Sequence, residues 1–141
     1  MVIAGGLGGF QPRKPNFDGI EYFEEKGVSY FIKEPKIFKD KNVIISGGGD
    51  SALDWTIELS KIAKKVTLIH RRNEFRGASD SVDKVQNLKD QNKIDLITPA
   101  EVFKLEGRDK LEKVLVKKEN EEIELSTDFF IPLFGLTPKL G

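Results

Sequence analysis

The sequence predicts an α/β domain: a Rossmann-like βαβ parallel sheet with an antiparallel β-meander in its second half. Three observations predict it. A continuous run of β-branched residues at 43–45 ends at three consecutive glycines, 47–49. A helical pattern follows and gives way to a second apolar run at 66–69, which completes one βαβ unit. From 101 to 127 polar and apolar residues alternate, the pattern of half-buried antiparallel strands.

The glycines match the dinucleotide fingerprint G-x-G-x-x-G/A as Gly47, Gly49 and Ala52. Gly47 permits a tight turn, Gly49 lets the backbone approach a pyrophosphate, and Ala52 lets the helix pack close to the strand. The N–H groups and the positive dipole end at the start of the helix would then hold the anion. The alternative is a glycine turn with a purely structural role.

The residues after the second strand indicate which dinucleotide is bound. NAD and FAD sites usually carry an acidic residue there, which binds a ribose 2′-hydroxyl. This chain instead has His70, Arg71 and Arg72, with Arg76 four residues later. Guanidinium groups match phosphate oxygens in charge and geometry, so the pattern favours NADP(H). The alternative is a pair of solvated arginines at a strand end, and the nearby Glu74 weakens the case for a phosphate site.

The sequence before the glycine turn predicts only short elements. Residues 1–10 predict a short strand that ends in a second glycine cluster, but Gln11, Pro12 and Pro15 prevent a helix from starting there. We expect a short helical turn within 17–26, a brief extended piece at 28–32, and a loop at Pro35.

Beyond the arginines, residues 79–91 predict a second helix with Ser79 or Asp80 as its N-cap. A third parallel strand is expected at 94–98. The meander follows, and residues 128–135 predict a last buried strand. Pro132 cannot donate a hydrogen bond, so this strand should end there or lie at a sheet edge.

Few side chains suggest a catalytic or metal-binding role. Asp50 and Asp54 could be paired carboxylates, but Ser51-x-x-Asp54 also fits a capping box, which we favour. His70 is the single histidine and has no nucleophile motif beside it, so we expect packing or nucleotide contact. Trp55 falls on the apolar helix face with Ala52 and is expected in the core. The sequence contains no pattern typical of a metal site, and no catalytic residue is assigned.

Composition excludes several classes of function. The 23 basic and 23 acidic residues cancel, which argues against a nucleic-acid partner. The absence of cysteine excludes disulfides and dithiol catalysis within these residues. Without a signal peptide or a long apolar run, we expect no membrane association and a cytoplasmic location.

Two stretches, GGGDSALDW at 47–55 and KKVTLIHRRNEFR at 64–76, resemble the NADPH-binding domain of thioredoxin reductase-like flavoproteins. Thioredoxin reductases carry Cys-x-x-Cys just before this glycine turn, and this chain has no cysteine there. GVSYF at 27–31 with KEP at 33–35, Asp54-Trp55 and residues 94–103 instead resemble the bacterial ferredoxin–NADP reductases of the same architecture.

The resemblance implies a role for each site residue. Amides from Gly48, Gly49, Asp50 and Ser51 would bind the pyrophosphate of NADP(H), and Arg71, Arg72 and Arg76 the 2′-phosphate. FAD would be bound outside these residues, and ferredoxin or flavodoxin would exchange electrons with it. Residues 13–127 would form the NADPH-binding domain, with 1–12 and 128–141 as crossovers to an FAD domain. The resemblance also allows a homodimeric parent.

Two alternatives stay open. The parent could be another thioredoxin reductase-like flavin reductase that acts on a protein disulfide or a small molecule. The chain could also be a non-enzymatic NADP(H)-binding module.

Overall fold

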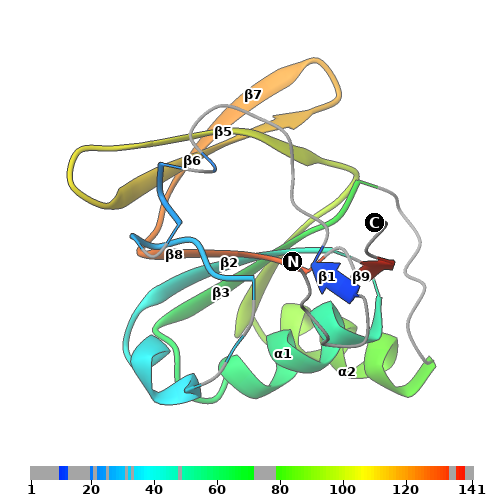
Figure 1. Cartoon of the computed structure of the whole chain (residues 1–141). Helices are drawn as coiled ribbons and strands as arrows, with labels where there is room; N and C mark the ends of the chain where they lie inside the picture. Colours follow the sequence, from blue (N-terminus) through cyan, green and yellow to red (C-terminus); the bar gives the residue numbers. More distant parts are fainter. Residues whose placement is uncertain are drawn as a thin grey trace.

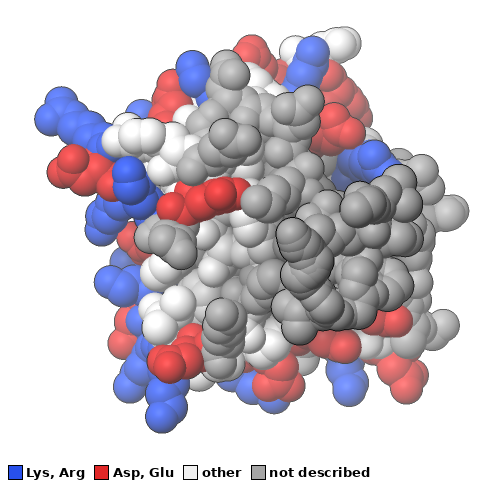
Figure 2. All heavy atoms as spheres, viewed as in Figure 1, with Lys and Arg blue, Asp and Glu red and all other residues white. Residues whose placement is uncertain are grey.

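The computed structural model describes residues 10–12, 20, 22–24, 26–30, 32, 34–47, 49–71, 79–133 and 136–138. The described residues form an α/β structure, as predicted. A parallel sheet has both helices on one face and the antiparallel meander over the other (Figure 1). Acidic and basic side chains are interspersed over the described part of the surface in Figure 2, as the balanced composition leads one to expect.

The elements in chain order are β1 (Phe10–Pro12), the 3-10 helix η1 (Pro35–Phe38), β2 (Asn42–Ser46), α1 (Asp50–Leu59), β3 (Lys65–Ile69), α2 (Ser79–Asp90), β4 (Ile94–Ile97), β5 (Glu101–Gly107), β6 (Leu111–Lys118), β7 (Glu121–Ser126), β8 (Phe129–Pro132) and β9 (Leu136–Pro138).

The parallel sheet has the strand order β4-β3-β2-β8. Val43 pairs with Val66 of β3 on one side and with Phe129 of β8 on the other, so β2 is central. β8 lies at the edge and ends at Pro132, which confirms the expectation for that proline. In the extended piece expected at 28–32, the described residues show a parallel bridge from Val28 to Phe130 on the outer side of β8.

Two cores lie on the two faces of this sheet. Val43 and Ile45 face the helices, whereas Ile44 between them faces the meander. In β8, Phe130 and Ile131 divide in the same way. Consecutive side chains of a strand point to opposite faces, so a strand covered on both sides needs an unbroken apolar run.

The meander has the order β5-β6-β7, which confirms the predicted hairpins. A hydrogen bond from Lys113 Nζ to Glu124 Oε1 at 2.9 Å, together with the carboxylate charge, raises the pKa of Lys113. Both groups are exposed, so this pair contributes little stability. Lys118 Nζ donates to Thr98 O at 2.9 Å and thereby ties the meander to the end of β4.

Two details before β2 differ from expectation, and a third expectation is not tested. Pro35 begins the 3-10 helix η1 where a loop was expected, and Phe38 at its end packs edge-on against Phe129. Among the described residues of 17–26, Ile20, Tyr22, Phe23 and Lys26 lie in turns and Glu24 in a bridge to Val28, in place of the predicted helical turn, with Lys26 N donating to Phe23 O at 2.8 Å. Residues 1–9 lie outside the described part, and the strand described next to them, β1, begins at Phe10.

The two segments nearest the chain ends lie side by side. Phe10 pairs antiparallel with Pro138, and β1 and β9 form a separate two-stranded sheet (Figure 1). Among the residues that the structure describes, no helix is long and apolar enough to cross a membrane.

Candidate dinucleotide site

The described members of the predicted site lie along the carboxyl ends of the parallel strands. Backbone hydrogen bonds join these ends in a continuous row: Leu133 N to Ser46 O at 2.8 Å, Gly47 N to Ile69 O at 2.9 Å, and His70 N to Ile97 O at 3.2 Å. The glycine turn after β2 and the basic residues after β3 therefore share one edge of the sheet.

The strand order places a topological switch point at this edge. From β2 the chain moves to β3 and then β4 on one side, whereas β8 adds on the other side. Open parallel sheets bind ligands in the crevice beyond the carboxyl ends of the strands where the order reverses. That point is the end of β2, where the glycine turn begins.

Gly47 is required by the backbone and by its neighbours. Its φ is +148°, and a Cβ at this position would clash with the carbonyl oxygen of Leu133 and lie 3.2 Å from Ala52 Cβ. Ala52 is fully buried, so helix α1 approaches the end of β2 closely. The close packing that the fingerprint demands of Gly47 and Ala52 is thus present. Leu133, the residue after β8, borders the glycine turn through its carbonyl group. No sequence motif pointed to this residue.

Gly49 has different surroundings. It is the N-cap of α1, and its φ of −91° is open to any residue. A Cβ added here would meet no atom of the described residues within 4 Å. The described part of the fold therefore does not need glycine at 49 and leaves the space in front of the helix open.

The first turn of α1 offers backbone donors to that space. The first intrahelical hydrogen bond runs from Leu53 N to Gly49 O at 3.1 Å, so the amides of Ser51 and Ala52 have no acceptor within the helix. The helix dipole places partial positive charge at the same point. Asp50 is an exposed acid in this turn, and Gly48 lies outside the described residues.

The predicted capping box is wrong. α1 begins at Asp50, one residue before Ser51, and its N-cap is Gly49, which makes no side-chain cap hydrogen bond. Asp54 accepts a hydrogen bond from Ser81 Oγ at 3.1 Å and so links α1 to α2. In α2 the helix spans Ser79–Asp90, so Ser79 and Asp80 both lie inside it and the expectation of either as N-cap is also wrong.

Ser51→Ala should therefore cost little stability. We expect the free energy of unfolding to fall by less than about 0.5 kcal/mol, against about 1 kcal/mol for the loss of a true N-cap. Thr56→Ala is the matched control, because the buried Thr56 hydroxyl donates to Ala52 O at 2.7 Å, and it should cost about 1 kcal/mol or more. Urea unfolding measures both, and equal losses would contradict the assigned helix start.

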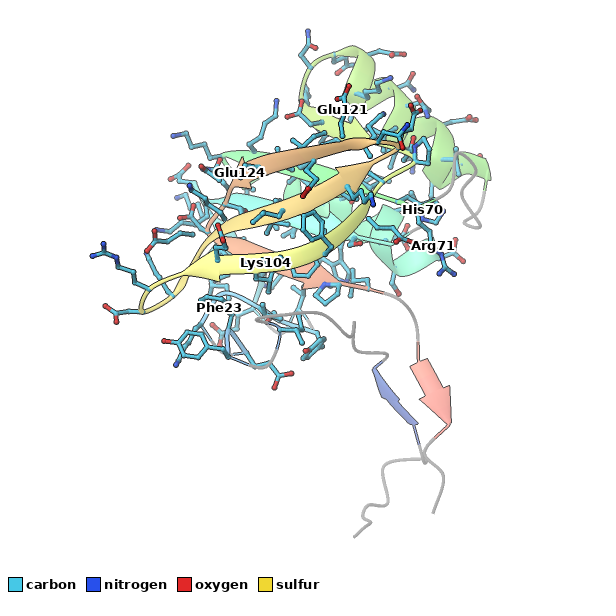
Figure 3. The ribbon with its side chains drawn as sticks, turned by 90° about the horizontal axis from the view of Figure 1, so that it is seen from above. Phe23, His70, Arg71, Lys104, Glu121 and Glu124 are labelled. Carbon is cyan, nitrogen blue, oxygen red and sulfur yellow. The ribbon has the colours of Figure 1, made fainter. Side chains whose placement is uncertain are left out.

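The residues after β3 divide into buried and exposed. His70 is 5% exposed, and its backbone carbonyl accepts from Ala100 N at 2.8 Å. The structure thus places its side chain in the packing, one of its two predicted positions. Arg71 follows at the surface, and its side chain points outward from the edge of the sheet (Figure 3). Arg72 and Arg76 lie outside the described residues.

Two further expectations concern the position of Trp55 and a metal site. Trp55 is half-buried against the helix-side core, close to the predicted position. The described ranges contain no group of three or more His, Asp or Glu residues that could hold a metal ion.

A family of known proteins matches nearly the whole chain. The pyridine nucleotide-disulphide oxidoreductase family matches residues 1–140. The chain belongs to this family. It spans about 40% of the length of the curated relatives it matches.

Two proteins similar to this chain are ferredoxin–NADP reductases from Flavobacterium. The protein of Flavobacterium johnsoniae is 60% identical over 141 residues, and that of Flavobacterium psychrophilum is 61% identical over 142 residues. Each alignment covers all of this chain and 40% of the relative.

Solved structures of thioredoxin reductases share the fold. The enzyme of Lactococcus lactis superposes with a TM-score of 0.82 at 28% identity and covers 92% of this chain and 43% of its own. That of Giardia duodenalis gives 0.82 at 29% identity, over 91% of this chain and 42% of its own. These findings confirm the recognised family and its α/β architecture.

Proposed function

We propose that this chain is the NADP(H)-binding part of a flavoprotein that acts as a ferredoxin–NADP reductase. The observation that carries the nucleotide assignment is Gly49. The fold leaves open space at this glycine, at the start of a helix and at the switch point of the sheet. A glycine that packing does not require is explained by a ligand that must approach the backbone there.

Each part of the site has a task in this proposal. Gly47 and Ala52 set the turn, and the amides between Gly48 and Ser51 bind the pyrophosphate. Arg71, Arg72 and Arg76 bind the 2′-phosphate through charge-assisted hydrogen bonds. Asp50 stabilises the helix dipole, and His70 supports the end of β3 from within the packing. These groups hold and orient the nucleotide, and none of them needs to transfer a proton.

The redox chemistry belongs to a flavin outside these residues. When bound, FAD would take hydride from NADPH and release single electrons to ferredoxin or flavodoxin. The identity of 60% to ferredoxin–NADP reductases supports this reaction for the parent protein. Residues 1–12 and 128–141 would be the crossovers to the FAD domain, and the pairing of β1 with β9 supports this division, because it brings the two segments together.

A second candidate is another thioredoxin reductase-like flavin reductase. The similarity to solved thioredoxin reductases favours it. However, this chain contains no cysteine, so a disulfide-reducing dithiol would have to lie elsewhere in the parent.

The purified 141-residue chain should bind NADP⁺ but should be colourless and catalytically inactive. In this proposal the chain holds the dinucleotide, and the flavin is held outside these residues. Equilibrium dialysis tests binding, and absorbance at 340 nm with ferricyanide as acceptor tests NADPH oxidation. Stoichiometric flavin in the preparation, or steady NADPH consumption, would contradict the proposal that the flavin site lies outside the chain. Absence of NADP⁺ binding would contradict the nucleotide assignment.

A further inference from the structure

The segment that follows β4 binds the backbone of His70 on both sides. His70 N donates to Ile97 O at 3.2 Å, and His70 O accepts from Ala100 N at 2.8 Å. His70 and Ala100 are both buried. Arg71 comes next in the chain, and its side chain points outward from the edge of the sheet (Figure 3). The backbone from which Arg71 extends is therefore fixed by residues 97–100.

A lysine from the meander fixes the middle of this segment. Lys118, the last residue of β6, donates from Nζ to Thr98 O at 2.9 Å, and the contact is partly buried. Hydrogen bonds from a charged donor are stronger than those between neutral groups, and removal from water strengthens them further. Lys118 thus holds residues 97–100 against the meander.

Lys118 occupies a position at which the fold would otherwise place an apolar side chain. Alternate residues of a strand face the same side. Val116 and Val114, two and four residues earlier, are fully buried in the core between the meander and the parallel sheet, together with Ile69. Burial of part of a charged side chain is unfavourable unless the charged group finds a partner. The lysine at the end of this inward-facing row is explained by its contact with Thr98 O.

We propose that Lys118 is a positioning residue for the 2′-phosphate of NADP(H). This inference rests on the proposed function, in which Arg71 binds that phosphate. Lys118 holds Thr98, residues 97–100 hold the backbone of His70, and Arg71 follows directly. The pyrophosphate contacts come instead from the turn between β2 and α1. Loss of the Lys118 contact should therefore weaken NADP⁺ binding more than NAD⁺ binding, because NAD⁺ has no 2′-phosphate.

The test is calorimetric titration of the 141-residue chain and three variants with NADP⁺ and NAD⁺. Lys118→Met removes the ammonium group but keeps a long side chain that suits an inward-facing position, so the fold should be kept. It should weaken NADP⁺ binding at least fivefold and NAD⁺ binding less than twofold. Lys118→Arg keeps a charged donor and should stay within threefold of the wild type for NADP⁺.

Lys117→Met is the matched control. It removes the same charge from the next residue of β6, which is exposed, and it should change the affinity for either nucleotide less than twofold. A general effect of positive charge on phosphate binding would appear in both methionine variants, whereas the positioning effect belongs to Lys118 alone.

Hydrogen exchange tests the mechanism apart from nucleotide binding. In Lys118→Met the amide hydrogens of His70 and Ala100 should exchange at least tenfold faster, because their hydrogen bonds belong to the segment that Lys118 holds. The amide of Gly47, which donates to Ile69 O at the same edge of the sheet, should exchange as in the wild type.

Any of four results would overturn the proposal: unchanged NADP⁺ affinity in Lys118→Met, equal losses for the two nucleotides, an equal loss in Lys117→Met or in Lys118→Arg, or a loss of affinity without faster exchange at His70 and Ala100. The last result would mean that Lys118 contacts the phosphate itself. If Lys118→Met binds NADP⁺ as tightly as the wild type, the positioning role is wrong and the proposed function stands. If the wild-type chain binds neither nucleotide, the proposed function fails and the positioning role fails with it.

Discussion

Gly49→Val is expected to abolish NADP⁺ binding while the chain stays folded. The valine side chain would project into the space in front of α1, where the proposed pyrophosphate lies, and its Cβ would meet no atom of the described residues within 4 Å. The backbone at 49 is extended and accepts any residue, so the free energy of unfolding should fall by less than about 1 kcal/mol. Calorimetric titration measures binding, and thermal unfolding measures stability.

Gly47→Ala is the comparison that separates binding from folding. A positive φ at a residue other than glycine costs about 1–3 kcal/mol, and the clash with Leu133 adds to it. This variant should be clearly destabilised, whereas Gly49→Ala should be nearly as stable as the wild type. Unchanged affinity in Gly49→Val would remove the glycine turn from the binding site. A large loss of stability in that variant would show that Gly49 serves the fold.

Arg71→Ala combined with Arg72→Ala should weaken NADP⁺ binding about a hundredfold and NAD⁺ binding little. Charge-assisted hydrogen bonds contribute roughly 1.5–3 kcal/mol each, and exposed groups such as Arg71 belong at the low end. Two such contacts give about 3 kcal/mol, at about 1.4 kcal/mol per factor of ten. Titration calorimetry with both nucleotides measures the two losses.

Two controls sharpen the arginine prediction. Arg76→Ala should show a smaller loss than the double variant. The preference for NADP⁺ should also shrink as salt rises, because exposed charges are screened. Equal losses for the two nucleotides would mean that the arginines act through folding or through the pyrophosphate.

The βαβ unit could be predicted because its pattern is local. The apolar run of β2, the glycines and the run of β3 follow one another in the chain, and the structure pairs Val43 with Val66 as a parallel unit requires. The meander was predictable for the same reason, since each hairpin joins neighbouring segments.

The sequence pattern could not predict contacts between segments that are far apart in the chain. The neighbour of β2 on its second side is β8, more than eighty residues later, and Asp128 accepts a hydrogen bond from Asn42 N at 2.9 Å. The role of Leu133 at the glycine turn depends on this pairing. Apolar spacing alone also misjudged α1: the polar Thr56 is fully buried because its hydroxyl bonds to Ala52 O, whereas Trp55 is half-buried.

The capping box failed for a related reason. Ser51-x-x-Asp54 has the correct spacing, but spacing does not fix where a helix starts. The glycine turn ends at Gly49, so the helix starts two residues earlier than an N-cap at Ser51 would require, and Ser51 lies inside it. Because of this early start, the amides of Ser51 and Ala52 lie in the first turn of α1, at the proposed pyrophosphate. The helix start that contradicts the capping box therefore supports the proposed binding site.

The most direct test of the nucleotide site is a map of NADP⁺ on the folded chain. Titration of the ¹⁵N-labelled 141-residue chain with NADP⁺, followed by nuclear magnetic resonance, reports each amide separately. We expect the largest shifts at Gly47, at residues 49–52 and at Arg71, with 2′-phospho-AMP reproducing the shift of Arg71. Shifts that spare the turn between β2 and α1, or a titration that leaves the spectrum unchanged, would contradict a dinucleotide site at this edge of the sheet.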